Sequence, residues 1–166
     1  MVLIGLGSNR GDSRRIVVEA MNRLSVFARG TVLRSHLWQT SPVDCPPSSA
    51  DFINAAVAFE PRADLTPEAL LTELKALERR YGRHPAPVRN APRELDLDLL
   101  LFGDETRNTE DFTLPHPRAV DRRFVLAPAV EVLPETIWPG TRQTIRQLLE
   151  ALESDEVVRR LEGVGT

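Results

Sequence analysis

The residues best suited to chemistry stand in the stretch 94–102, where acids alternate with leucines. Leucines occupy positions 95, 97, 99 and 101, and Asp96 and Asp98 lie between them. A period of two predicts a β-strand with these four leucines on the face toward a core. Asp96 and Asp98 then share the other face, roughly 7 Å apart along the strand. Leu100 and Phe102 follow on that face, so the acids mark the N-terminal end of the strand.

Two carboxylates this close require a cation, because they repel each other and lose hydration when partly buried. Arginine could supply the charge, and so could Mg²⁺, which prefers oxygen ligands. Two such ions about 3.5–4 Å apart hold phosphoryl groups in many transferases. An isolated Asp-x-Asp pair is more often a solvated strand face with arginine partners, so the neighbouring residues must decide.

Cationic residues gather on both sides of this strand in the sequence. The loop 83–93 carries three arginines, Arg83, Arg89 and Arg93. The cationic residues that follow the strand are His116, Arg118, Arg122 and Arg123. Guanidinium groups bind phosphate oxygens in a bidentate manner, and a neutral imidazole can donate to phosphate without adding charge. Loops also carry charge for solubility, but arginines beside paired acids favour a phosphate site.

A third candidate feature lies at the start of the strand predicted over 51–60, where Phe52 and Asn54 share a face. An aromatic ring beside an amide could bind a flat heterocycle by stacking and hydrogen bonding. The alternative, which these two residues alone favour, is a core phenylalanine beside an asparagine that caps a turn.

The elements that must position these residues follow the order β-α-β-β-α-β up to residue 102. The predicted strands span 1–6, 31–38, 51–60 and 94–102, with helices starting near residues 13 and 66. This order is typical of an α+β, ferredoxin-like fold, an antiparallel sheet covered by helices on one face. Residues 105–114 suggest a short ribbon. The rest predicts an appended C-terminal helical lobe, with a last helix from Thr141 or Thr144 and a frayed or short amphipathic tail from Ser154. No linker divides the chain, so residues 1–166 are expected to form one domain.

Composition restricts the function classes. The 166 residues carry a net charge of −3, so no overall field favours nucleic acid. Cys45 is the single cysteine, which excludes a disulfide framework and a cysteine metal cluster. We find no signal peptide and no apolar run long enough for a membrane span, so a cytoplasmic location is expected. A Walker-type kinase is excluded because the Gly-x-x-x-x-Gly-Lys pattern is absent.

Taken together, the motifs resemble the 6-hydroxymethyl-7,8-dihydropterin pyrophosphokinase family of the folate pathway. The matching stretches occur in the family's order and cover nearly the whole chain. They are Gly7-Ser8-Asn9-Arg10-Gly11-Asp12, Thr40-Ser41-Pro42-Val43, Phe52-Ile53-Asn54-Ala55, Gly82-Arg83, Pro92-Arg93-Glu94-Leu95-Asp96-Leu97-Asp98, Leu114-Pro115-His116-Pro117-Arg118 and Arg122-Arg123-Phe124-Val125-Leu126.

The resemblance implies transfer of pyrophosphate from ATP to the pterin hydroxymethyl group, with release of AMP. Asp96 and Asp98 match the ligands of two Mg²⁺ ions, and Asp96 also lies where it could accept the proton of the pterin hydroxyl. The residues that match contacts to ATP or the transferred group are Glu78, Arg83, Arg89, Arg93, His116 and Arg122. Arg83 and Arg93, with the two aspartates, match the catalytic set. The residues that match the pterin site are Thr40, Val43, Phe52, Asn54, Asp96 and Phe124.

Three departures from the family pattern concern loop behaviour and rate rather than the class of reaction. Pro85 stands where many members have an arginine, Asn90 where a tryptophan is common, and Phe52 where tyrosine is frequent. Two alternatives remain open: an RNA-binding module, which shares the β-α-β-β-α-β order but needs a basic and aromatic surface, and a catalytically inactive relative. The expected partners are small molecules only, with no nucleic acid and no membrane, and the chain is expected to be a monomer.

Overall fold

The computed structural model describes residues 1–40, 51–82 and 94–162. Its main sheet has the strand order β5-β1-β4-β3-β8, and β2 also pairs with β4. All of these pairs are antiparallel. The strands of this sheet are β1 (Val2–Ser8), β2 (Leu33–Arg34), β3 (Trp38–Thr40), β4 (Phe52–Phe59), β5 (Asp96–Phe102) and β8 (Val158–Arg160). A separate two-stranded ribbon pairs β6 (Arg107–Asn108) with β7 (Thr113–Leu114).

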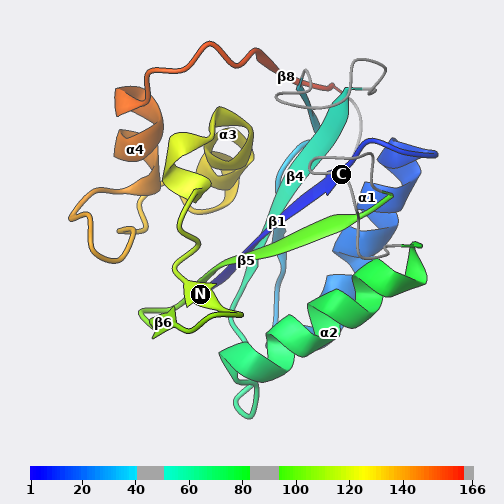
Figure 1. The fold of residues 1–166 in the computed structure, drawn as a ribbon, viewed down its shortest axis with the longest axis vertical. Helices are drawn as coiled ribbons and strands as arrows, with labels where there is room; N and C mark the ends of the chain where they lie inside the picture. Colours follow the sequence, from blue (N-terminus) through cyan, green and yellow to red (C-terminus); the bar gives the residue numbers. More distant parts are fainter. Residues whose placement is uncertain (41–50, 83–93, 163–166) are drawn as a thin grey trace.

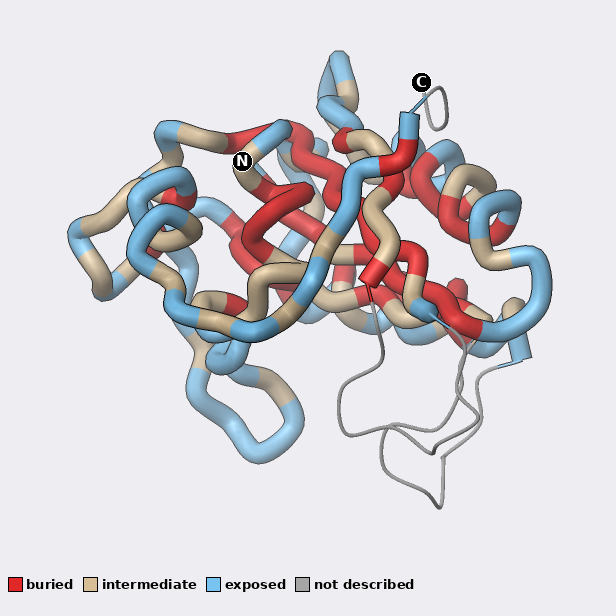
Figure 2. The backbone as a smooth tube through the Cα atoms, turned by 90° about the horizontal axis from the view of Figure 1, so that it is seen from above, coloured by how far each residue is buried: buried red, intermediate tan, exposed pale blue. Residues whose placement is uncertain are grey.

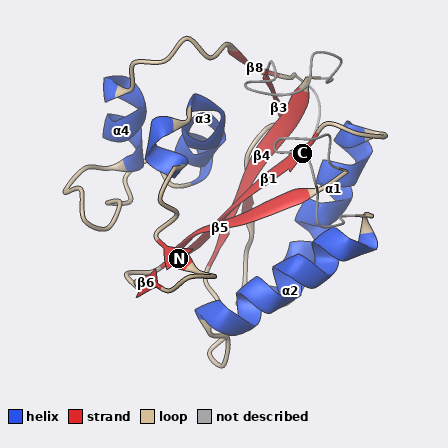
Figure 3. Cartoon of the chain, in the orientation of Figure 1, coloured by secondary structure: helices blue, strands red, loops and turns tan. Residues whose placement is uncertain are grey.

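Helices lie on both faces of the sheet, with α1 and α2 on one side and α3 and α4 on the other (Figures 1 and 3). The α-helices are α1 (Ser13–Arg23), α2 (Pro67–Arg80), α3 (Arg123–Val132) and α4 (Ile145–Ala151). Two short 3₁₀ helices, η1 (Leu24–Phe27) and η2 (Ala119–Asp121), precede β2 and α3. The fold is therefore mixed α and β, built on an antiparallel sheet. Among the described residues no helix is long and apolar enough to cross a membrane.

Local capping explains why three of the helices begin where the sequence predicts. The side chain of Asp12 accepts a hydrogen bond from the backbone of Arg15 at the start of α1. Thr66 caps α2 in the same way, with Pro67 as the first helical residue. Thr144 caps α4 through a reciprocal capping box. Each cap satisfies backbone amides that have no partner within the helix.

Each face of the sheet has its own apolar core, and the buried trace runs through the centre of the molecule (Figure 2). The first core joins α1 and α2 to alternate residues of the strands, including Ile4, Val57 and Leu97. The second core joins α3 and α4 to the opposite face, where Ala56 and Ala58 of β4 lie. Helices α3 and α4 thus cover the second face of the sheet, which is the face that carries Asp96, Asp98 and Asn54.

The predicted alternation in β5 fails at its C-terminal end. Leu3 of β1 pairs with Leu101, but Ile4 pairs with Leu99, so the register shifts between them. An extra residue in one strand turns every following side chain to the opposite face. Leu101 therefore lies in the second core and Phe102 in the first, the reverse of the sequence prediction.

The strand predicted over 31–38 is wrong in its continuity, because β2 and β3 are separate. Ser35 lies between them and bonds twice with Ala56 of β4: its amide donates to the carbonyl of Ala56, and its Oγ accepts from the amide of Ala56. A side-chain oxygen thus takes the place of a backbone acceptor and interrupts the ladder.

Two further elements differ from the sequence prediction. The tail, expected to be a frayed or short amphipathic piece, contains β8, which pairs with β3 at the edge of the sheet. Helix α3 was not predicted, because Pro128 stands inside it and proline disfavours helix interiors.

Candidate active site

The predicted metal ligands, Asp96 and Asp98, are half-buried at the N-terminal end of β5. Asp96 pairs with Gly7 of β1, and Asp98 pairs with Gly5. Paired residues point to the same face of a sheet, so β1 presents two glycines beside the two acids. The sheet surface next to these carboxylates therefore carries no β1 side chain.

Asn54 lies on the next strand of the same row, because Gly7 pairs with it across β1 and β4. Its side chain is 5% exposed, and its Nδ2 donates to Oγ1 of Thr40 over 2.9 Å. A Cβ added at Gly7 would lie 3.0 Å from Oδ1 of Asn54. The absence of a side chain at Gly7 is thus what lets this amide lie close to the sheet.

The pairing of β3 with β4 brings together three residues predicted for the pterin site. Thr40 pairs with Phe52, and two residues further along the two strands Trp38 pairs with Asn54. Thr40 is buried, whereas Phe52 is half-buried and keeps part of its ring accessible. The sequence prediction that Phe52 and Asn54 share a face is confirmed. Trp38 belongs to the same row and was not singled out by the sequence.

His116 is hydrogen-bonded both to β5 and to the cationic segment that follows this strand. Its amide donates to the carbonyl of Leu100 over 3.0 Å, and its Nδ1 accepts from the amide of Arg118 over 3.3 Å. Burial lowers the pKa of His116 below its usual 6.5; the charges of Arg122 and Arg118 also lower it, while that of Asp96 raises it. The imidazole is therefore neutral at pH 7, in a setting shared by Asp96 and Arg122.

Phe124, the second aromatic residue predicted for the pterin site, lies in the first turn of α3. The guanidinium carbon of Arg122 lies 5.6 Å from the centre of the Phe124 ring, within range of a cation–π interaction. Arg123 points elsewhere: its amide donates to Oε2 of Glu156, and its side chain donates to the carbonyl of Leu152. Arg123 thus anchors the segment that leads to β8.

Glu78, predicted to bind ATP, has a structural contact in addition to any role in binding. It is 7% exposed in the last turn of α2, and its Oε2 accepts a 2.7 Å hydrogen bond from the amide of Leu97. Leu97 stands between Asp96 and Asp98, so this bond fixes the backbone that carries both acids. The sequence reports the type of residue at position 78 but not this contact.

Several predicted residues lie outside the described part of the chain. They are Val43, Arg83, Arg89 and Arg93, together with the departures at Pro85 and Asn90. Their predicted roles stay predictions. The sequence prediction did not include Gly5 and Gly7 in the site, because only the strand pairing places them opposite Asp98 and Asp96.

Comparison with known proteins identifies the family of this chain. Residues 3–134 match the family model described as 7,8-dihydro-6-hydroxymethylpterin-pyrophosphokinase (HPPK). The chain belongs to this family. It is 36% identical to 2-amino-4-hydroxy-6-hydroxymethyldihydropteridine pyrophosphokinase of Synechocystis over 155 residues, which cover 93% of this chain and 77% of that protein. It is 41% identical to the Bacillus subtilis protein of the same name over 130 residues, which cover 78% and 75%.

Other relatives carry the HPPK unit within longer chains. The folic acid synthesis protein fol1 of Pneumocystis carinii is 30% identical over 156 residues, which are 94% of this chain but 20% of that protein. Crystal structures of Plasmodium falciparum HPPK-DHPS are similar in fold, one with a TM-score of 0.67 at 14% identity. That match covers 90% of this chain and 42% of the Plasmodium chain, so the chain spans about two fifths of it.

Proposed function

We propose that this protein transfers pyrophosphate from ATP to the hydroxymethyl group of 6-hydroxymethyl-7,8-dihydropterin, giving AMP and the pterin diphosphate in folate biosynthesis. The observation that carries the proposal is the row across the sheet in which Asp96, Gly7 and Asn54 lie side by side. Asp96, proposed to act on the phosphates, and Asn54, proposed to bind the heterocycle, therefore share one face of the sheet in a chain that belongs to the HPPK family.

Asp96 and Asp98 are the proposed ligands of two Mg²⁺ ions. The donor set fits this ion, because Mg²⁺ takes one or two carboxylates and completes its shell with water and substrate phosphates. Among the described residues no group of three or more acidic, histidine or cysteine side chains could hold a metal. Two half-buried carboxylates beside a glycine surface leave coordination positions for a triphosphate. When bound, the ions neutralise the phosphate charge that builds up during transfer.

The cationic residues are proposed to hold ATP. The charges of Arg122 and Asp96 both act on the pKa of His116, so the three residues lie near one another. A neutral His116 can donate one hydrogen bond without adding charge. Arg83, Arg89 and Arg93 are proposed to bind the phosphate chain, and Glu78 to lie near the nucleotide. Arg83 and Arg93 complete the catalytic set with the two aspartates.

The pterin is proposed to lie between the rings of Phe52 and Phe124, with Asn54 on its polar edge. Thr40 holds the amide of Asn54, and the backbone near Thr40 and Val43 supplies further polar contacts. In this position the substrate hydroxyl is the nucleophile, and Asp96 lies where it could accept the proton. Transfer then depends on positioning and charge neutralisation rather than on a covalent intermediate.

The finer statements about architecture belong to the same proposal. The strand order supports a ferredoxin-like core made of β1, β3, β4 and β5 with α1 and α2, and an appended lobe made of α3 and α4. We propose one domain over residues 1–166, a monomer, and a cytoplasmic location. The RNA-binding alternative is not favoured, because Asp96 and Asp98 on this face would repel RNA phosphates. The inactive relative is not favoured, because both acids of the family motif are present.

The test is an assay with ATP, Mg²⁺ and 6-hydroxymethyl-7,8-dihydropterin that separates AMP from ADP. We expect AMP release that depends on the pterin; ADP release, or no nucleotide turnover, would refute the proposed reaction. Asp98→Asn is expected to lower turnover about 100- to 1000-fold, the usual effect of removing one preorganised charged group. Asp104→Asn, an exposed acid in the turn after β5, is the matched control and is expected to keep wild-type turnover.

A further inference from the structure

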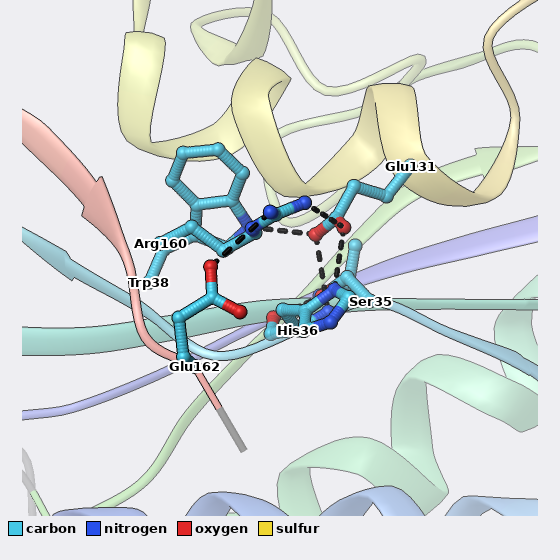
Figure 4. Close-up of polar contacts among 7 residues, drawn as sticks. Ser35, His36, Trp38, Glu131, Arg160 and Glu162 are labelled. Atoms are coloured by element: carbon cyan, nitrogen blue, oxygen red, sulfur yellow. Dashed lines mark hydrogen bonds and ion pairs between the residues drawn. The ribbon is translucent and has the colours of Figure 1, made fainter. Parts of the chain in front are cut away.

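Glu131, near the C-terminal end of α3, contacts four polar groups of other elements (Figure 4). Its Oε1 accepts hydrogen bonds from the amide of His36 over 3.0 Å and from Nε1 of Trp38 over 2.8 Å. Its Oε2 lies 2.7 Å from Nδ1 of His36 and 3.9 Å from a guanidinium nitrogen of Arg160. Arg160 is also bonded to Glu162. Although Glu131 is an exposed helix residue, its side chain is only 20% exposed, because it folds down onto the strands.

These contacts reach the row of residues on which the proposed site is built. Trp38 pairs with Asn54 on one side and with Arg160 on the other. Asn54 pairs in turn with Gly7, and Gly7 with Asp96. Glu131 therefore binds one end of a row whose other members are the proposed pterin and metal residues.

The same helix carries Phe124 in its first turn, seven residues before Glu131. At 1.5 Å per residue the two positions are about 10 Å apart along the helix axis. The side chain that binds the strands and the ring proposed to stack on the pterin thus belong to one continuous helix. A contact that restrains Glu131 therefore also restrains the position of Phe124.

Apolar packing alone does not determine how far α3 is shifted along the sheet. The β4 residues under the helix are Ala56 and Ala58, which present small side chains, and α3 meets them with Leu126, Ala129 and Val132. Burial of apolar area is non-directional, so contact with these small side chains fixes the position of the helix less exactly than directional contacts do. Hydrogen bonds depend on distance and angle, and Glu131 supplies these directional contacts.

We propose that Glu131 is a positioning residue for the pterin site: it fixes α3 on β3 and so fixes the distance of Phe124 from Phe52 and Asn54. This inference rests on the proposed function. It predicts a larger effect on the pterin than on ATP, because Phe124 lies on α3 whereas, of the proposed ATP residues, only Arg122 lies at the start of this helix.

The test compares Glu131→Ala with Glu131→Gln. The alanine variant leaves the donors of His36 and Trp38 without their protein acceptor. Glutamine keeps a carbonyl oxygen for these two donors and can turn its amide hydrogens toward Nδ1 of His36. We expect the alanine variant to raise the Kd for the pterin roughly tenfold, the size of one lost hydrogen bond to a charged group. The glutamine variant is expected to restore most of the affinity.

Glu135→Ala is the matched control. Glu135 lies in the same lobe and forms an ion pair with Arg146 in which its side chain is 67% exposed, so its removal is expected to leave the pterin Kd unchanged. The KM for ATP is measured for every variant and is expected to change less than the Kd for the pterin, because Arg122 is the one proposed ATP residue at the start of α3. Hydrogen exchange of residues 123–132 reports the anchoring directly and is expected to be faster in Glu131→Ala than in Glu131→Gln.

The outcomes separate this inference from the proposed function. An active wild-type enzyme in which Glu131→Ala binds the pterin normally overturns the inference and leaves the function intact. The same holds if the alanine variant raises the KM for ATP as much as the pterin Kd, or if Glu131→Gln is as impaired as Glu131→Ala. A wild-type protein that releases no AMP overturns the proposed function itself.

Discussion

Gly7 offers a sharp test of the site, because its missing side chain makes room for the amide of Asn54. A Cβ added at Gly7 would lie 3.0 Å from Oδ1 of Asn54, whereas one added at Gly5 would meet nothing closer than Cδ1 of Leu100 at 3.4 Å. Neither glycine has a positive φ, so alanine is compatible with the backbone at both positions. Gly7→Ala and Gly5→Ala form a matched pair on one strand that differs in what the new methyl group contacts.

The size of the effect follows from the surroundings of Asn54. The residue is 5% exposed, and its Nδ2 donates to Oγ1 of Thr40 over 2.9 Å. The amide cannot move away from a new methyl group without lengthening that bond. One such hydrogen bond contributes about 0.5–1.5 kcal/mol, which corresponds to about a 2- to 13-fold change in an equilibrium constant. We therefore expect Gly7→Ala to raise the Kd for the pterin by this factor, whereas Gly5→Ala, whose new methyl group contacts Leu100 instead of Asn54, is expected to leave it unchanged.

The assay is a fluorescence titration of the pterin against wild type, Gly5→Ala and Gly7→Ala, with ATP affinity measured in parallel. Unfolding of each variant by denaturant shows that the protein remains folded. A Gly7→Ala protein with wild-type pterin affinity would refute the reasoning. An equal loss in both alanine variants would refute it too, because the effect would then follow from the strand rather than from the contact with Asn54.

Two further predictions concern stability. Glu78→Ala leaves the buried amide of Leu97 without its acceptor and is expected to lower the free energy of unfolding by about 1–3 kcal/mol. Glu78→Gln keeps an acceptor, so its free energy of unfolding is expected to fall by less. Equal denaturation midpoints for wild type and Glu78→Ala would contradict this. Arg107 donates to the exposed Glu68 and lowers its pKa below the usual 4.5, so the stabilisation is present above pH 4.5 and is lost as the pH falls through the lowered pKa. Thermal unfolding should therefore show a small advantage of wild type over Glu68→Gln at pH 7 that disappears on acidification, and an advantage that persisted in strong acid would contradict the assignment.

Much of the local structure could be predicted because its causes lie within a few residues. The capping side chains at Asp12, Thr66 and Thr144 fix the starts of three helices, and each needs only the next turn of chain. The alternation in β4 separates its two faces correctly. Where a local rule meets an opposing residue the prediction fails, as with Pro128 inside α3, or with Ser35, whose side chain replaces a backbone acceptor and divides the strand.

For the candidate site as well, the sequence predicts the types of residue but not their arrangement in space. Residue types at Asp96, Asp98 and Asn54 indicate metal, phosphate and heterocycle chemistry, and the motifs around them identify the family. They do not show that one row of an antiparallel sheet joins Asp96 to Asn54 through Gly7. That row depends on pairing between strands far apart in the sequence, and a shift of register by one residue would turn the side chains to the other face.

The sequence by itself determined the chemical groups, the family, and the elements whose periodicity and capping are local. Only the tertiary structure decided that α3 and α4 cover the second face, that the tail returns as β8 beside β3, and that Glu131 binds His36. The contact between Glu131 and His36 spans 95 residues of chain. No local pattern specifies it, because it exists only when packing brings α3 onto the sheet and directional hydrogen bonds select one position for the helix.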